Sequence, residues 1–168
     1  MASPTKSELI AALQKSGDGL LTGVGKMTDA DLSQGRYENG WTARQILAHV
    51  ASIEWTYKKL VDTAKQPRSA ARPSGEPGAY AAPPPTGNPI DDYNNRQVAR
   101  RAAKTAQELL LEFKENRDGT IAAVKSCDDD LLAQPTRSTG GAQGTLAEVI
   151  MFVAVRHVEQ HTRDLLGG

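Results

Sequence analysis

Length, composition and charge together limit the kinds of protein that this sequence can encode. The chain has 168 residues, enough for one domain with a buried core, and we expect residues 1–168 to form a single domain. Its 20 basic and 20 acidic residues cancel, so we expect neither a nucleic acid nor a membrane as the partner. No apolar run approaches the roughly 18 residues that a membrane-spanning helix needs.

The N-terminus and the single cysteine indicate the cellular compartment. No apolar segment of the signal-peptide kind precedes the first helical pattern. Cys127 is the only cysteine, which excludes a disulfide within the chain and suits a reducing environment. We therefore expect a cytoplasmic protein. Because the acidic run 128–130 follows Cys127 and disfavours a thiolate, we expect this cysteine to be structural.

Two helices are predicted in the first part of the chain. Apolar residues at helical spacing predict the first helix over about residues 5–26. The second begins near residue 42 with a capping box and a hydrophobic staple, and its apolar face continues through His49 to about Leu60. The start signal consists of Thr42 as the N-cap, Gln45 in the capping box, and Trp41 with Ile46 in the staple.

Residues 66–92 have a different composition from the rest of the chain. Seven of the nine prolines lie in this segment, together with several glycines and almost no aliphatic residues. A connection of this length inside a compact domain is typical of a functional lid or of a crossover that runs back along a helix. We expect a Pro/Gly-rich crossover loop, and its composition also fits a mobile surface loop.

Two further helices are predicted in the second part of the chain. The third covers about residues 93–125, either unbroken or with a break near Gly119. The fourth begins at Thr145, where Glu148 completes a second capping box, and it ends near Leu166. No segment shows the alternation of a strand, so we predict an all-α chain.

The two halves of the chain contain a weak internal repeat. Residues 19–32 resemble residues 119–131, and each stretch is followed by a glycine-containing link and a Thr-capped helix. A duplicated helix–hook–helix unit predicts a four-helix bundle with pseudo-two-fold symmetry, in which the long connection joins the two repeats.

The three histidines of the chain can meet in one site if the helices that carry them are antiparallel. His157 and His161 are four residues apart, which places them one turn apart on the same helix face. His49 lies seven residues into the second predicted helix, and the pair lies 12 and 16 residues into the fourth. Parallel helices with level starts would offset the histidines by roughly 8–14 Å, whereas antiparallel helices bring them level. The histidines and the long connection therefore predict the same up-down-down-up bundle.

A three-histidine site would leave coordination positions open for water or substrate, as reactive metal sites do. The alternative is that each histidine is a core residue with a hydrogen-bonded partner. Asp164 returns to the face of His157 and either orients a ligand or caps the helix end. Glu54 is the nearest candidate for a general base, but it lies about 140° round the helix from His49. Tyr57 either lines a cavity at the site or belongs to the core.

Two segments of the sequence resemble a known family. The first runs from Gly40 to Trp55 and reads Gly-Trp-Thr-Ala-Arg-Gln-Ile-Leu-Ala-His-Val-Ala-Ser-Ile-Glu-Trp. The second runs from Arg156 to His161 and reads Arg-His-Val-Glu-Gln-His. Together they resemble the DinB/YfiT-like superfamily, which includes the N-terminal domain of mycothiol-dependent maleylpyruvate isomerase.

The resemblance implies a four-helix up-down-down-up bundle that binds one divalent ion, commonly zinc or nickel, through His49, His157 and His161. Members often form homodimers. Several are regarded as S-transferases or isomerases that use a low-molecular-weight thiol, and others as metal-dependent hydrolases. We therefore expect a metal-dependent enzyme of the thiol S-transferase type that acts on a small-molecule substrate. The alternatives are a metal-dependent hydrolase and a non-catalytic module that binds a metal or small ligand or that dimerises.

Overall fold

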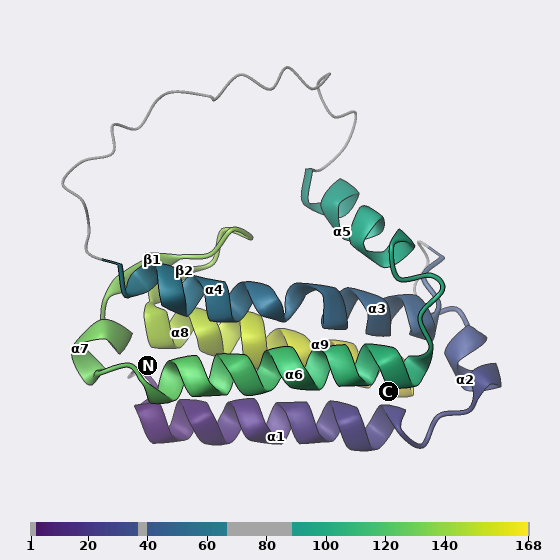
Figure 1. Ribbon diagram of the computed structural model, residues 1–168, viewed down its shortest axis with the longest axis horizontal. Helices are drawn as coiled ribbons and strands as arrows, with labels where there is room; N and C mark the ends of the chain where they lie inside the picture. Colours follow the sequence, from purple (N-terminus) through teal and green to yellow (C-terminus); the bar gives the residue numbers. More distant parts are fainter. Residues whose placement is uncertain (1–2, 37–39, 67–88, 168) are drawn as a thin grey trace.

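The computed structural model describes residues 3–36, 40–66 and 89–167, and they form the predicted all-α four-helix bundle (Figure 1). Four long rods lie side by side, each made of one helix or of consecutive helices. They are α1 (Lys6–Val24), α3 (Ala43–Ile53) with α4 (Trp55–Ala64), α6 (Ala106–Lys125), and α8 (Leu146–Ile150) with the π-helix η1 (Met151–Arg156) and α9 (His157–Leu166). Among the described residues, no helix combines the length and the apolar character that crossing a bilayer requires.

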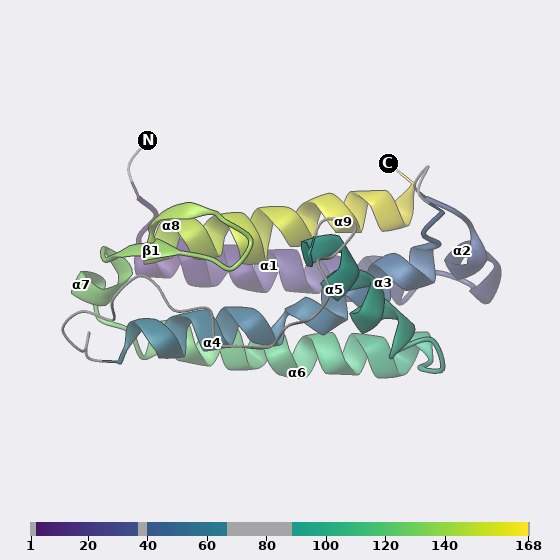
Figure 2. The same cartoon turned by 90° about the horizontal axis from the view of Figure 1, so that it is seen from above.

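The directions of the rods confirm the predicted up-down-down-up topology. The first rod starts at the end of the bundle that holds the N-terminus, the second and third run back toward that end, and the fourth runs away from it (Figures 1 and 2). Helix α1 contacts α6 and α9, and α3 also contacts α6 and α9, so the rods enclose one common core. The second and fourth rods are thus antiparallel neighbours, which brings the helix of His49 beside the helix of His157.

All four rods begin with a capping box. In each box a threonine side chain accepts a hydrogen bond from the third backbone N–H of the helix, and the side chain at that third position accepts one from the threonine N–H. Such a cap stabilises a helix by about 1 kcal/mol and fixes its first residue. The boxes predicted for the second and fourth rods are confirmed, and two more are present. The four pairs are Thr5–Glu8, Thr42–Gln45, Thr105–Glu108 and Thr145–Glu148.

The helix predicted over residues 93–125 is in fact two helices. The first is α5 (Pro89–Ala99), and the turn after it leads into α6. The break occurs at this turn, and not near Gly119, because the capping box of Thr105 starts a new helix there. Gly119 lies inside the continuous α6, since the roughly 1 kcal/mol cost of one glycine in a helix is small beside the packing of the whole rod.

The predicted connecting loop 66–92 also ends earlier than expected. Residues 89–92 form the first turn of α5, where a proline is well tolerated and two acidic side chains interact favourably with the helix dipole. Residues 67–88 of the predicted loop lie outside the described residues. The crossover or lid at that position therefore remains a prediction.

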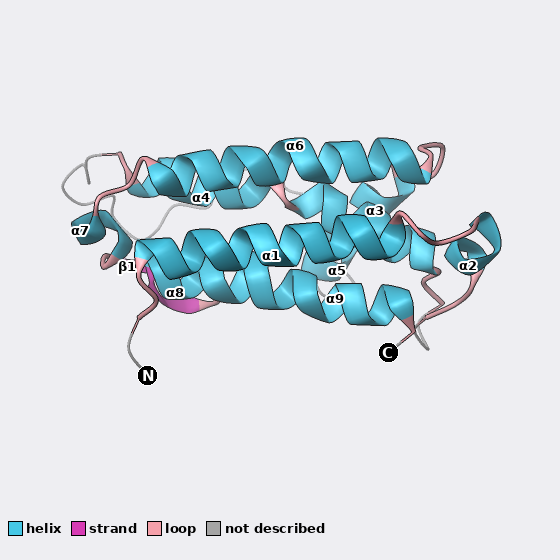
Figure 3. Cartoon of the chain, turned by 90° about the horizontal axis from the view of Figure 1, so that it is seen from below, coloured by secondary structure: helices cyan, strands magenta, loops and turns pink. Residues whose placement is uncertain are grey.

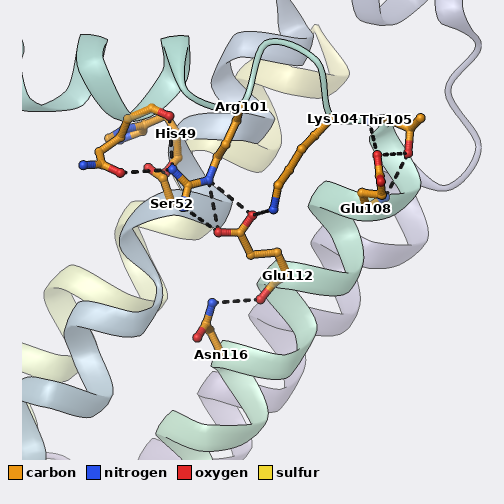
Figure 4. A network of polar contacts seen from close by, with 9 residues as sticks. His49, Ser52, Arg101, Lys104, Thr105, Glu108, Glu112 and Asn116 are labelled. Atoms are coloured by element: carbon orange, nitrogen blue, oxygen red, sulfur yellow. Dashed lines mark hydrogen bonds and ion pairs between the residues drawn. The ribbon is translucent and has the colours of Figure 1, made fainter.

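Helix α5 packs against α3, the helix that carries His49. Its Val98 belongs to the hydrophobic core, and the turn that follows is tied to α6 by charged side chains. Arg101 Nη2 and Lys104 Nζ donate to the Glu112 carboxylate at 2.6 and 2.7 Å (Figure 4). These contacts tie the turn after α5 to the third rod, while α5 itself packs on the second.

The second rod is interrupted at Glu54, a short distance after His49. Ser52 Oγ donates to the His49 carbonyl at 2.7 Å, and a similar bond links Thr56 Oγ1 to the carbonyl three residues before it at 2.6 Å. Hydroxyl groups that bond to backbone carbonyls compete with the backbone hydrogen bonds of a helix and bend it. The Tyr57 N–H accordingly reaches the Glu54 carbonyl, three residues back. The helix predicted from residue 42 to about 60 is therefore divided into α3 and α4.

The sequence repeat corresponds to a repeated local structure. The short helices α2 (Asp29–Ser33) and α7 (Asp129–Leu132) follow the first and third rods. After each short helix, the first residue of the next rod donates its N–H to the carbonyl of a glutamine at the matching position. These bonds, both 2.9 Å, join Ala43 to Gln34 and Leu146 to Gln134. The predicted helix–hook–helix unit is therefore present twice.

The second hook contains a small antiparallel hairpin of β1 (Pro135–Arg137) and β2 (Gln143–Thr145), with Pro135 opposite Thr145 (Figure 3). No strand was expected here, and the hairpin is a local exception within the confirmed all-α fold. Strands of three residues are too short to show the period-two alternation by which strands are recognised in a sequence.

Candidate metal centre

The structure brings the three histidines together between the second and fourth rods. His49 projects from α3, His157 is the first residue of α9, and His161 lies one turn later. One ring nitrogen from each histidine lies within 4.8 Å of the others. Their ring centroids are 4.4–5.6 Å apart, close to edge-on in every pair. Among the described residues, this trio is the group of histidine, cysteine and acidic side chains with the spacing of a metal site.

The hydrogen-bond partners of His157 and His161 lie on the Nδ1 side of each ring. The Nε2 atoms of both rings therefore face each other in the space between the histidines. Asp164 Oδ2 lies 3.3 Å from His161 Nδ1, and the Tyr57 hydroxyl lies 3.4 Å from His157 Nδ1. If each Nδ1 carries its proton toward that oxygen, each Nε2 keeps a lone pair for a ligand. The two Nε2 atoms are 2.9 Å apart. Nitrogens that bind one zinc ion at about 2.0–2.1 Å lie at a comparable separation from each other, so the pair fits a shared cation.

His49 provides an independent test of this fit. Its side chain is buried, and its Nδ1 has no hydrogen-bond partner among the described residues. A buried polar atom without a partner costs about 1–3 kcal/mol, and such atoms in native proteins call for an explanation such as an ion. The indole of Trp41 packs at 5.3 Å between centroids on one side of the imidazole. The predicted Trp41 staple therefore also forms a wall of the site.

All three imidazoles are kept neutral by their surroundings. Burial, with a smaller contribution from the neighbouring imidazoles, lowers the pKa of His49 to about 3 and that of His157 to about 4. Burial also lowers the pKa of His161, although Asp164 opposes that shift. Neutral imidazole is the form that binds metals, so the site is ready for a cation at neutral pH.

The candidate second-layer residues have distinct positions. Asp164 orients His161, as the sequence allowed, and Tyr57 reaches His157 while remaining buried. Burial, with a further contribution from Glu54, raises the pKa of Tyr57, so its hydroxyl stays protonated. Glu54, the candidate base, is engaged in a buried ion pair. Its carboxylate is fully buried and pairs with Arg117, at 2.7 Å between Oε1 and Nε.

Two other sequence predictions concern residues away from the site. Glu148 accepts from the Thr145 N–H at 2.8 Å and is a capping residue, as expected. Cys127 is buried, and its Sγ donates to the Ala123 carbonyl at 3.2 Å. Burial raises the pKa of the Cys127 thiol, so the structure gives this cysteine the surroundings of a structural residue.

Sequence reasoning missed Arg117 and the π-helix. Arg117 lies on the apolar face of α6, four residues after Phe113 and seven before Val124, and it is 3% exposed. A charged residue at a core position of a helical pattern signals a buried partner, and Glu54 was available for that role. The π-helix η1 leaves no comparable signal, because the apolar spacing of residues 146–158 also fits an α-helix.

Comparison with known protein families assigns the chain. A family model described as the mycothiol maleylpyruvate isomerase N-terminal domain matches residues 13–166. The chain belongs to this family. The assignment confirms the resemblance to the DinB/YfiT-like superfamily, which the sequence carried in the segments around His49 and His157. A search of curated protein sequences finds no match.

Members and neighbours of the isomerase domain family are also found among solved structures. Crystal structures of the mycothiol-dependent maleylpyruvate isomerase superpose with a TM-score of 0.71 and 16% sequence identity, over 98% of this chain and 63% of the isomerase. The chain thus spans less than two thirds of that protein. YfiT from Bacillus subtilis, described as a probable metal-dependent hydrolase with an unusual four-helix bundle topology, gives 0.68 and 18%, over 99% of this chain and 87% of YfiT. An uncharacterised protein from Clostridium difficile 630 gives 0.65 and 14%, over 98% and 95%. At these identities the likeness establishes the fold.

Proposed function

We propose that this chain is a metal-dependent enzyme in which His49, His157 and His161 bind one divalent cation, zinc or nickel, and which uses a low-molecular-weight thiol in a transfer reaction. The observation that carries the proposal is the convergence of three neutral imidazoles within 4.8 Å. The family name and the mycothiol-dependent isomerase support the thiol. The description of YfiT as metal-dependent supports the cation.

A divalent cation bound by three neutral histidines would lower the pKa of a thiol in an open position and so supply a nucleophile at neutral pH. The chain's own residues prepare this site. Asp164 and Tyr57 fix the ring orientations of His161 and His157. Trp41 packs against one side of the His49 imidazole. Orientation by outer partners of this kind typically strengthens metal binding by about 10–100-fold.

The alternative is a metal-dependent hydrolase, which the likeness to YfiT favours. Hydrolysis of this kind uses a metal-bound water and commonly a carboxylate that takes up its proton. The two carboxylates considered for this role are both engaged, Asp164 with His161 and Glu54 with Arg117. A thiol loses its proton far more readily than water does, so thiol chemistry makes a smaller demand on a base. We therefore place the thiol reaction first.

The test uses untagged full-length protein with Cys127→Ser, so that an added compound is the only thiol present. Elemental analysis should find about one zinc or nickel ion per chain, and none in the matched variant that also carries His157→Ala and His161→Ala. The protein is then loaded with Co²⁺ and titrated with mycothiol. A new thiolate-to-cobalt charge-transfer band in the absorption spectrum supports the proposal. A protein that binds no metal refutes it. A protein that binds Co²⁺, shows no such band and hydrolyses ester or amide substrates is a hydrolase instead.

A further inference from the structure

Arg117 is a buried cation on α6, the third rod. Its side chain bonds to residues on each of the other three rods. Its guanidinium donates to the Leu13 carbonyl and to Ser16 Oγ on α1, both at 3.1 Å. It pairs with Glu54 on the second rod through contacts of 2.7 and 2.9 Å. It also donates from Nη2 to the Ala154 carbonyl, inside η1, at 2.7 Å. The last bond links the buried pair to the rod that carries two of the three histidines.

The π-helix η1 decides which way the histidines of α9 face. An α-helix takes 3.6 residues per turn with i→i+4 bonds, and a π turn uses i→i+5 bonds and so takes in an extra residue. The His157 N–H donates to the Phe152 carbonyl, five residues back. One extra residue rotates everything after it by about 100° relative to an uninterrupted α-helix. Since α8 is held in the core by the fully buried Ile150, the π turn sets the direction of His157 and His161.

A π turn is rare and needs support from its surroundings, and Arg117 is placed to give that support. Ala154 lies in the middle of η1, three residues before His157. The Ala154 carbonyl accepts a hydrogen bond of 2.7 Å from the guanidinium, shorter than the 3.1 Å bond to the Leu13 carbonyl. Because the donor is charged, this bond belongs to the stronger class of hydrogen bond. If the turn reverted to an α-helix while α8 stayed anchored, both imidazoles would rotate off the face that meets His49.

We propose that Arg117 is a positioning residue for the metal centre. By binding the Ala154 carbonyl it stabilises the π turn of η1, and that turn directs His157 and His161 toward His49. Glu54 compensates the charge of Arg117 and keeps the guanidinium in the core. This inference rests on the proposed three-histidine metal site, but it concerns the placement of the ligands and not the reaction.

The test compares variants by how tightly and in what geometry they bind Co²⁺. The main variant is Glu54→Leu with Arg117→Met, which removes both buried charges together and avoids an unpaired one. The matched control is Ser16→Ala, which removes a different bond of the same guanidinium and leaves the bond to Ala154. The rescue variant adds deletion of Phe152 to the main variant. This side chain is 57% exposed, so the deletion removes the extra residue of the turn without emptying the core.

Affinity is measured by competition with a chelator, geometry by the visible Co²⁺ spectrum, and folding by circular dichroism and urea titration. We expect a loss of about 10–100-fold in Co²⁺ affinity and an altered spectrum in the main variant. Ser16→Ala should keep the wild-type Co²⁺ affinity and spectrum. Deletion of Phe152 should restore the affinity, because a continuous α-helix that is one residue shorter again points His157 and His161 toward His49. A folded main variant with wild-type affinity and spectrum would overturn the proposal, as would a deletion that weakens binding further.

A second measurement separates this inference from the metal proposal itself. Nuclear magnetic resonance of the histidine rings in the metal-free protein reports the surroundings of His157 and His161 directly. If the main variant shifts these ring signals and Ser16→Ala does not, Arg117 positions the two histidines even when the wild-type protein binds no Co²⁺. Unchanged ring signals in the main variant overturn the role.

Discussion

Replacing Arg117 alone should destabilise the bundle far more than replacing it together with its partner. In Arg117→Met, the Glu54 carboxylate stays fully buried without a positive charge, and the Leu13 and Ala154 carbonyls each lose a donor. Removing one member of a buried pair costs about 3–5 kcal/mol. In Glu54→Leu with Arg117→Met no charge is left behind, so the cost falls to the lost carbonyl bonds, about 1–2 kcal/mol. The single variant should therefore be about 2–3 kcal/mol less stable than the double variant.

Urea denaturation followed by circular dichroism, with a chelator present so that metal binding does not contribute, measures both values. Since domains of ordinary stability unfold with a free energy of about 5–15 kcal/mol, the single variant should still give a measurable transition or be visibly unfolded. Glu54→Leu alone completes the double-mutant cycle and gives the coupling energy of the pair. The reasoning is refuted if the double variant is as unstable as Arg117→Met, because the unpaired charge would then contribute nothing.

Three further outcomes are expected. Gly19→Ala should stabilise the protein by about 0.5–1 kcal/mol, because Gly19 lies inside α1 and an added Cβ would meet no atom within 4 Å; a lower urea midpoint would contradict this. Asp164→Asn should weaken zinc binding by about 10–100-fold by chelator competition, since it removes the carboxylate that orients His161, and unchanged affinity would exclude that role. The metal-free protein should lose stability as the pH falls from about 6.5 toward 4. Its unfolded histidines take up protons in that range, while His49 and His157, with pKa values lowered to about 3 and 4, stay neutral. Urea midpoints at pH 7 and pH 5 measure this loss, which should shrink in the His157→Gln/His161→Gln variant.

The sequence predicts the bundle and the histidine trio because both depend on short-range patterns. Capping boxes at Thr42 and Thr145 fix where two rods begin, and the spacing of His157 and His161 fixes their common face. Counting residues from these two helix starts was enough to place His49 level with His157 and His161 when the second and fourth rods are antiparallel. The clustering of the three histidines could therefore be predicted without any knowledge of how the rods pack in detail.

The features that escaped prediction depend on contacts between distant residues or on small backbone changes. The pairing of Arg117 with Glu54 joins positions 63 residues apart in the chain. The π turn of η1 has the same apolar spacing as an α-helix, and the break before Thr105 was hidden by a helical pattern on both sides. The missed capping box at Thr105 was visible in the sequence, and it would have divided the predicted third helix correctly.

The duplicated helix–hook–helix unit has a consequence for how metal and folding are linked. His49 belongs to the first unit, whereas His157 and His161 belong to the second. A cation shared by the three is then a cross-link between two halves of the chain, and neither half holds a complete ligand set. Loss of such a cation would therefore weaken the contact between the two halves. In the proposed metal centre, cation binding would thus also stabilise the association of the two helix–hook–helix units.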